Sequence, residues 1–268
     1  MAKFQQEMIS VAGCRVSVFR GGAGEPLLHL HGAGVVRSVM PFMEFLAETF
    51  DVIIPQHPGF GDSDEPDWLE GMGDLAYFYL EFMEQLDLRG VHLGGTSLGG
   101  WLAMEIALRN TERLKTLTLV GAGGIHVEGV ERGKSREWGP QETMRQVIYN
   151  QVLAEKMIAT MPANPEQDPV HQKNRRTIGK LVKPPTYNPD IQKWAHIVKI
   201  PVHIIWGDHD RLLPMAFAPE YAKLFDDATL DIMKECGHIP YMEKPREYAD
   251  VITRFIQKAT QTENAGAR

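Results

Sequence analysis

The chain has 268 residues, enough for one large α/β domain or two small ones with a sizeable buried core. Hydrophobic residues make up 43% and charged residues 24%, which is ordinary for a globular protein. The net charge of -7 argues against a nucleic-acid partner, because binding a phosphate backbone requires a basic surface. The same charge slightly favours a neutral or apolar small-molecule ligand.

The first residues lack the apolar core of a secretion signal, and no uninterrupted apolar run approaches the length of a membrane span. We therefore expect a cytoplasmic protein without a membrane partner. The two cysteines, Cys14 and Cys236, are far apart in sequence and have no metal-ligand spacing, so neither a disulfide framework nor a zinc cluster is predicted.

Short apolar or β-branched runs alternate with helical patterns through the first 120 residues. Strands are predicted at 16–19, 27–30, 52–54, 91–93 and 117–120, and amphipathic helices around 42–46 and 75–86. Such alternation predicts a mostly parallel central sheet with helices on both faces.

The alternation stops at residue 124. Residues 124–196 contain no convincing strand but hold amphipathic material at 144–161 and a proline-rich stretch. Strand and helix patterns return at 202–206, 217–225, 229–233 and 247–256. We therefore predict an α/β core formed by 1–123 and 197–268, with 124–196 as a helical insertion.

Residues 94–100 read Gly-Gly-Thr-Ser-Leu-Gly-Gly, between an apolar run and a helical stretch. A serine between glycines where a strand becomes a helix is held on a sharp turn, and its hydroxyl projects from the edge of the sheet. The pattern predicts Ser97 as a nucleophile.

A serine hydroxyl needs a base and a group that orients the base. His238 lies in a glycine-bearing loop between the last short strand and the last helix, and loops at the carboxyl ends of parallel strands converge. Asp208 and Asp210 follow the preceding core strand, and either could orient the histidine.

Several motifs together resemble those of the α/β-hydrolase superfamily, over about residues 16–256. They are His31-Gly32-Ala33-Gly34, His57-Pro58-Gly59-Phe60-Gly61-Asp62-Ser63, the turn at Ser97, Trp206-Gly207-Asp208-His209-Asp210, and Gly237-His238. The resemblance implies the chain order nucleophile, acid, histidine, which is Ser97, Asp210 and His238 here. The family's acid lies three residues after the glycine that ends the strand, which selects Asp210 and leaves Asp208 to brace the loop.

The resemblance also implies an oxyanion hole, because acyl transfer builds negative charge on a carbonyl oxygen. Its backbone N–H donors would be those of Leu98 and Ala33, with Gly34 as an alternative to Ala33. His31 is expected to brace its loop, and His57 and Asp62 to shape a loop near the site. His29 and His31 alternate on one strand end, but no third ligand follows at a suitable spacing, so no metal or cofactor is predicted.

In the family the segment between the sixth and seventh core strands forms a helical cap, and residues 124–196 fall there. Apolar side chains of such a cap would line the substrate pocket. The candidates are Trp138, Met144, Ile148, Met157, Met161 and Trp194. Packing within the cap's own small core is an equally good reading of each. Lys173, Arg175, Arg176 and Lys180 are interpreted as a solvated helix face rather than an anion site.

These residues favour a serine hydrolase acting on small carboxylic esters or lactones. A carbon-carbon hydrolase of ring-cleavage diketones uses the same three residues, but such relatives usually carry Asn before the nucleophile and Trp after the histidine, where this chain has Thr96 and Ile239. Dehalogenase and epoxide-hydrolase chemistry is disfavoured because it needs a carboxylate nucleophile. A small-molecule receptor without turnover is the third hypothesis, and a homo-oligomer is left open.

Overall fold

A computed structural model describes residues 3–266, and its centre is one eight-stranded sheet. The strands lie in the order β1-β2-β4-β3-β5-β6-β7-β8. The pairs β1/β2 and β2/β4 are antiparallel, and every later pair is parallel. The crossover from β3 to β5, with β4 outside it, brings the carboxyl ends of β3, β5 and β6 side by side.

The strands extend the predicted ones by a few residues at their ends. Their bounds are β1 Gln5–Val11, β2 Cys14–Gly22, β3 Pro26–Leu30, β4 Asp51–Pro55, β5 Val91–Thr96, β6 Leu114–Val120, β7 Val202–Gly207 and β8 Ala228–Met233. The sequence prediction missed β1, an edge strand that is mostly exposed. The available signal was the two-residue turn Ala12-Gly13, which has positive φ at both residues and joins β1 to β2 as a hairpin.

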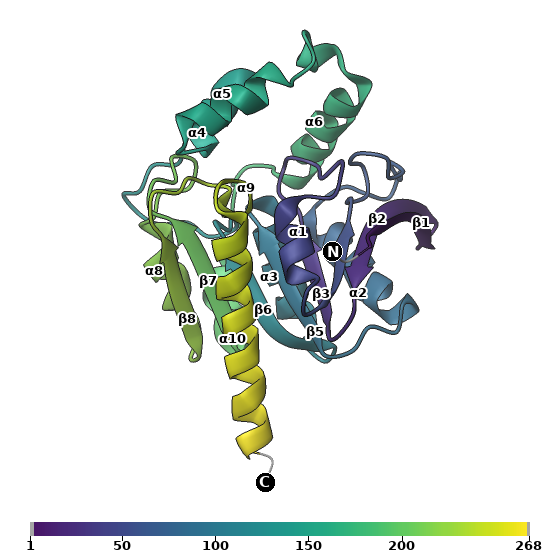
Figure 1. Cartoon of the computed structure of the whole chain (residues 1–268), viewed down its shortest axis with the longest axis vertical. Coiled ribbons are helices and arrows are strands. Elements are labelled where there is room, and N and C mark those ends of the chain that lie inside the picture. Colours follow the sequence, from purple (N-terminus) through teal and green to yellow (C-terminus); the bar gives the residue numbers. More distant parts are fainter. Residues whose placement is uncertain (1–2, 267–268) are drawn as a thin grey trace.

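Helices cover both faces of the sheet, as the sequence predicts (Figure 1). Apolar side chains of α2 Met72–Gln85, α3 Leu98–Arg109 and α8 Phe217–Ala222 form one core cluster with the strands. On the other face α1 Pro41–Leu46 packs against α10 Pro245–Gly266, with the short helix α9 Pro240–Glu243 just before it. Helices on both faces of a mostly parallel sheet are the layering that the sequence predicts.

The insertion (residues 124–196) forms helices that lie mostly at one end of the sheet (Figure 1), although its last α-helix also contacts α3. They are α4 Pro140–Val147, α5 Gln151–Ala159, η1 Pro165–Gln167, α6 Pro169–Leu181, α7 Pro189–Trp194 and η2 Ala195–Ile197. The amphipathic stretch 144–161 covers the end of α4 and all of α5. The break falls at Ile148, and the Asn150 side chain starts α5 by accepting a hydrogen bond from the Leu153 N–H at 3.1 Å.

Candidate active site

Ser97 occupies a strained turn between β5 and α3. Its backbone has φ 57° and ψ -112°, a region that costs a non-glycine residue about 1–3 kcal/mol. The neighbouring glycines are there because the backbone passes so closely: a Cβ at Gly95 would lie 2.1 Å from the Gly99 oxygen, and a Cβ at Gly99 would lie 2.1 Å from the Leu30 oxygen. The turn therefore has the geometry that the sequence motif predicts.

The carboxyl end of β6 holds this turn from one side. The Ser97 N–H donates to the Val120 carbonyl at 2.8 Å, and the Gly123 N–H donates to the Ser97 carbonyl at 3.1 Å. The loop after β3 lies close as well, since a Cβ at Gly32 would be 3.9 Å from the Ser97 Oγ. Strands β3, β5 and β6 thus place Ser97 between two loops at one edge of the sheet.

His238 and Asp210 form a buried pair at the same edge. The His238 Nδ1 lies 2.6 Å from Asp210 Oδ2, and the two side chains are 5% and 0% exposed. The other Asp210 oxygen accepts the N–H groups of Leu212 and Leu213, each at 2.8 Å. This fixes the carboxylate in a single orientation, and with it the imidazole.

The position of His238 relative to β6 is given by Gly121, where a Cβ would lie 3.2 Å from the His238 Nδ1. Gly121 directly follows Val120, which binds the Ser97 N–H. The His238 Nε2 is buried and has no hydrogen-bond partner within the part of the chain that the structure describes. An unpaired buried imidazole nitrogen beside the serine turn is a group available to a reacting hydroxyl.

Asp208 has a different environment from Asp210. Its Oδ1 lies 2.6 Å from the His209 Nδ1 and accepts the Cys236 N–H at 3.2 Å. Burial tends to raise the pKa of Asp208, but the bonds to His209 and to the Cys236 N–H outweigh it and hold the pKa below its usual value. Asp208 therefore joins the loops after β7 and β8, as a bracing residue would.

The predicted oxyanion donors belong to two backbone segments, the start of α3 and the loop after β3. Leu98 is the first residue of α3, where a backbone N–H has no partner inside the helix. Ala33 and Gly34 are exposed in the loop after β3, next to the buried Gly32 that lies against Ser97. Leu98 adjoins Ser97 in the chain, and Ala33 and Gly34 follow a glycine that lies against it. The role of their N–H groups as oxyanion donors stays a prediction.

Three predicted pocket residues lie in one apolar cluster with residues that flank the His238–Asp210 pair. The cluster has Val147, Ile148 and Ala154 at its centre, with Met144, Leu153, Met157, Leu212 and Ile239 packed against it. Leu212 is two residues from Asp210, and Ile239 follows His238. Ile148, Met144 and Met157 therefore form an apolar wall that is continuous with the catalytic candidates, and they also pack the insertion's own core.

The other three predicted pocket residues lie elsewhere. Trp138 packs against Gly133, whose Cβ would meet the indole at 2.5 Å. Met161 is half-buried just beyond the end of α5. Trp194 is 44% exposed, and its ring contacts Lys193 and His196 on the same surface segment. The structure does not bring Trp194 into the apolar wall, because its side of α7 faces solvent.

The basic residues of α6 attach the insertion to the core. The Lys173 ammonium donates to the Ser63 carbonyl at 2.9 Å, and Arg176 and Lys180 pair with Glu65 at 3.0 and 3.5 Å. The Thr177 hydroxyl donates to the Gly59 carbonyl at 2.8 Å. These side chains serve the docking of α6 on the loop after β4, and the interpretation as a solvated face was incomplete because sequence does not show the partner.

Glu243, which the sequence analysis did not select, joins the His238 loop to the insertion. Its Oε1 accepts the Gly237 N–H at 2.7 Å and its Oε2 accepts the Asn150 N–H at 2.9 Å. The His238 N–H itself donates to the Val147 carbonyl at 2.8 Å. The link between α4 and α5 is therefore bonded directly to the loop that carries the imidazole.

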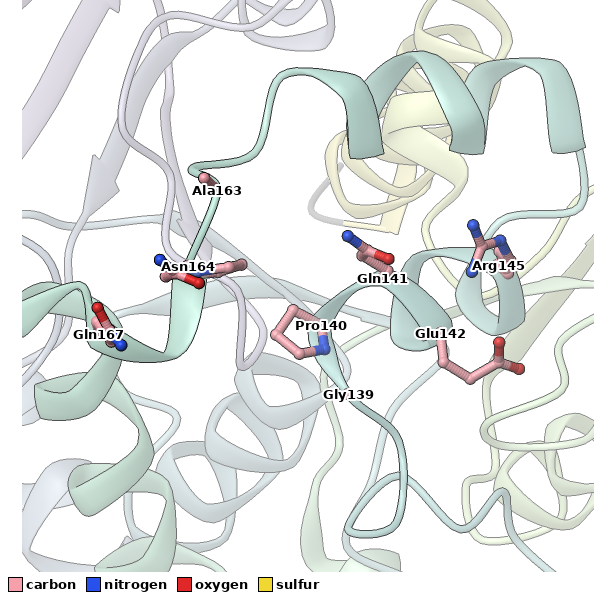
Figure 2. Close-up of a pocket in the computed structure, with 9 residues that line it drawn as sticks. Gly139, Pro140, Gln141, Glu142, Arg145, Ala163, Asn164 and Gln167 are labelled. Atoms are coloured by element: carbon pink, nitrogen blue, oxygen red, sulfur yellow. The ribbon is translucent and has the colours of Figure 1, made fainter.

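A cavity of about 450 Å³ lies inside the insertion, between α4 and the segment that follows α5 (Figure 2). Its lining residues come from 139–145 and 163–167 and are mostly polar. Ser97 and His238 lie outside it. Among residues 3–266, no group of three or more His, Cys, Asp or Glu side chains is arranged to hold a metal ion. No helix in the same range is long and apolar enough to cross a membrane.

A serine on a strained strand-to-helix turn, with a buried histidine-carboxylate pair beside it on a mostly parallel sheet, defines the class of α/β hydrolases. A model of the alpha/beta hydrolase family matches residues 27–251. The chain therefore belongs to that family, and the general prediction of a hydrolase is confirmed with it.

Two relatives of different named activity show what the chain is similar to. A 2-hydroxy-6-oxo-6-phenylhexa-2,4-dienoate hydrolase of Comamonas testosteroni is 27% identical, over 88% of this chain and 89% of the relative. Lipase 1 of Psychrobacter immobilis is also 27% identical, over 87% of this chain and 77% of the lipase.

The solved structure of a meta-cleavage product hydrolase from Pseudomonas fluorescens IP01 has a TM-score of 0.82 and 22% identity, covering 94% of this chain and 98% of that one. At this identity the likeness supports the fold alone.

Proposed function

We propose that this chain is a serine hydrolase that cleaves small carboxylic esters or lactones through an acyl-enzyme. Ser97 would be the nucleophile, His238 the general base and Asp210 the acid that orients the base. The observation that supports this best is the buried 2.6 Å contact between His238 and Asp210, against the same end of β6 that holds the Ser97 turn.

In the proposed reaction the Ser97 oxygen attacks the ester carbonyl carbon while its proton passes to the His238 Nε2. Asp210 holds the proton on Nδ1, so that Nε2 keeps the lone pair that accepts. Collapse of the tetrahedral intermediate breaks the bond to the alcohol oxygen, which takes the proton from His238. Water then attacks the acyl-enzyme with the same base, releasing the carboxylic acid and restoring Ser97.

The backbone N–H groups of Leu98 and of Ala33 or Gly34 would stabilise the negative oxygen of the intermediate. Each such donor is typically worth about 10²- to 10³-fold in rate. Residues 124–196 would act as the cap. The apolar wall of Ile148, Met144 and Met157 meets Leu212 and Ile239 beside His238. This supports a neutral substrate with an apolar acyl or alcohol part, because a charged group there would lose its hydration.

Hydrolysis of p-nitrophenyl acetate and butyrate by the Ser97→Ala variant tests the proposal. We expect turnover to fall by about 10³-fold or more while the melting temperature stays near that of the wild type. Hydrolysis at a near wild-type rate by this variant would falsify the assignment of Ser97. Labelling with a fluorophosphonate probe gives a second measurement, since a receptor without an activated serine would stay unlabelled.

Carbon-carbon hydrolysis of ring-cleavage diketones is the second candidate, and the relative from Comamonas testosteroni favours it. The same three residues could serve that reaction. A panel of short and long esters, lactones and a ring-cleavage dienoate, with Ser97→Ala as the control, separates the two. We expect the ester with the highest kcat/KM to exceed the dienoate, and the reverse order would assign the chain to the second candidate.

A further inference from the structure

Three buried side chains lie in a row behind the loop that carries Ala33. Tyr79 is on α2, His57 follows β4, and His31 follows β3. Their exposed fractions are 0%, 0% and 2%. The proposed reaction uses none of them, yet every ring atom that can hydrogen bond in the two histidines has a partner at 3.0 Å or less.

The partners of His31 determine which of its nitrogens carries the proton. The backbone N–H of His57 donates to the His31 Nε2 at 3.0 Å, so this nitrogen must be unprotonated. The His31 Nδ1 lies 2.6 Å from the Gly32 carbonyl, which can only accept, so Nδ1 carries the proton. Burial agrees with a neutral ring, because it lowers the pKa of His31 to about 4 despite bonds to the Gly32 and Gly34 backbone.

The same reasoning determines the protonation of His57. Its Nε2 lies 2.9 Å from the His31 carbonyl and must donate. Its Nδ1 lies 2.6 Å from the Tyr79 hydroxyl. Burial lowers the pKa of His57 well below its usual value, so the ring is neutral and Nδ1 accepts the tyrosine proton. Four hydrogen bonds thus connect α2, through His57 and His31, to Gly32.

Packing restricts the same groups. The imidazole rings of His31 and His57 lie with their centroids 3.8 Å apart and their planes at 30°. The Phe60 ring packs edge-on against both, with centroid distances of 5.3 Å to His31 and 5.7 Å to His57. Gly32, at the end of this row, lies against Ser97. The position of the loop relative to the serine is therefore set by the row of rings behind it rather than by the loop's own exposed residues.

We infer that Tyr79, His57 and His31 form a positioning chain that holds the loop Gly32–Gly34 against Ser97, so that its backbone N–H meets the oxyanion of the intermediate. This inference deepens the proposed function and rests on it. Tyr79 contacts no reacting atom, and it acts by donating to the buried His57 Nδ1, which holds the ring in place for its bond to the His31 carbonyl.

The Tyr79→Phe variant tests the inference, because it removes one hydroxyl and leaves the ring in place. We expect kcat for p-nitrophenyl butyrate to fall about tenfold, with KM within about twofold of the wild type. An intact oxyanion donor contributes about 10²- to 10³-fold to the rate, and a displaced donor loses part of that contribution. Inhibition by a trifluoromethyl ketone is the second readout. The Ser97 oxygen adds to its carbonyl carbon, the proton passes to His238, and the carbonyl oxygen becomes the anion. We expect its inhibition constant to rise by the same factor as kcat falls.

His57 supplies a conservative pair of variants. In His57→Gln the side-chain amide can still donate to the His31 carbonyl and accept from Tyr79, whereas His57→Leu can do neither. We expect kcat to fall less in His57→Gln than in His57→Leu. Tyr241→Phe is the matched control, since Tyr241 is a buried tyrosine that packs on Phe42 on the opposite face of the sheet. We expect its kcat to stay within about twofold of the wild type.

The inference is overturned if Tyr79→Phe and His57→Leu leave kcat and the inhibition constant within twofold of the wild type. It is also overturned if the losses of activity follow the losses in melting temperature equally in Tyr79→Phe and Tyr241→Phe, because the role would then be structural only. These outcomes are distinct from failure of the proposed function, which would appear as hydrolysis at a near wild-type rate by the Ser97→Ala variant.

Discussion

Two buried histidines on opposite sides of Ser97 have similar surroundings but different partners. The Nδ1 of His238 lies 2.6 Å from a carboxylate oxygen of Asp210, and the Nδ1 of His57 lies 2.6 Å from the hydroxyl of Tyr79. Both imidazoles are almost fully buried. The His238 Nε2 has no partner within residues 3–266, whereas the His57 Nε2 donates to a carbonyl.

The partner decides what each ring can do. A carboxylate stabilises the imidazolium that forms when a base accepts a proton, so His238 can change its charge during a reaction. A phenol has no charge to offer, and burial then holds His57 neutral. One residue type thus gives a group suited to proton transfer on one side of the serine and a fixed hydrogen-bonding element on the other.

Replacing Asp210 removes the negative charge beside His238, and we expect this change to give the largest loss of kcat. In Asp210→Asn the amide NH₂ can donate to the His238 Nδ1 and so move the ring proton to Nε2. The ring then cannot accept from Ser97, and kcat should fall about 10³- to 10⁴-fold. Steady-state kinetics on p-nitrophenyl butyrate measure the loss. Asp208→Asn is the matched control and should lose less than about tenfold; a larger loss at Asp208 than at Asp210 would exchange their roles.

Acid should destabilise the folded protein, because the fold contains buried neutral imidazoles. Burial lowers the pKa of His31 to about 4, and burial with the nearby His31 lowers the pKa of His29 to about 3, against 6.5 unfolded. Below pH 6.5 the unfolded chain binds protons that the folded chain does not, so the free energy of unfolding falls with pH. We expect a loss of about 1–2 kcal/mol for each of the two rings between pH 7 and pH 5.

Urea denaturation at pH 7, 6 and 5 measures this loss. His29→Gln should flatten the dependence, while His126→Gln, at an exposed position, should leave it unchanged. A wild-type free energy of unfolding that does not change between pH 7 and pH 5 would contradict the neutral state of these rings.

The smallest loss of kcat is expected on replacing Glu243, which supports the loop that carries His238. Its two oxygens accept one N–H each, from Gly237 and Asn150, and the amide of Glu243→Gln can accept only one of them. We expect kcat to fall about tenfold, because the loop that carries His238 loses one of its bonds. Glu247→Gln, on an exposed part of α10, is the control. Equal kinetics for the two variants would show that Glu243 has no part in placing the base.

Sequence patterns predicted most of the sheet because buried parallel strands contain short continuous apolar runs, such as Val52-Ile53-Ile54 in β4 and Ile204-Ile205-Trp206 in β7. They missed β1, since an exposed edge strand carries little apolar signal. The serine turn was predictable from its glycines. The reason is local at Gly95, where a Cβ would meet the Gly99 oxygen, whereas at Gly99 a Cβ would meet the Leu30 oxygen of β3.

The sequence by itself determined the chemical types at the site: one serine on a tight turn, one histidine in a late loop, and two candidate carboxylates. The family resemblance had already selected Asp210 over Asp208, and the tertiary structure added its contact with His238. Only the tertiary structure placed Ile148 beside Ile239, left Trp194 largely exposed, and joined Tyr79 to His57. The physical reason is that a turn depends on neighbours along the chain, whereas burial and hydrogen-bond partners depend on segments that meet only after the sheet has formed.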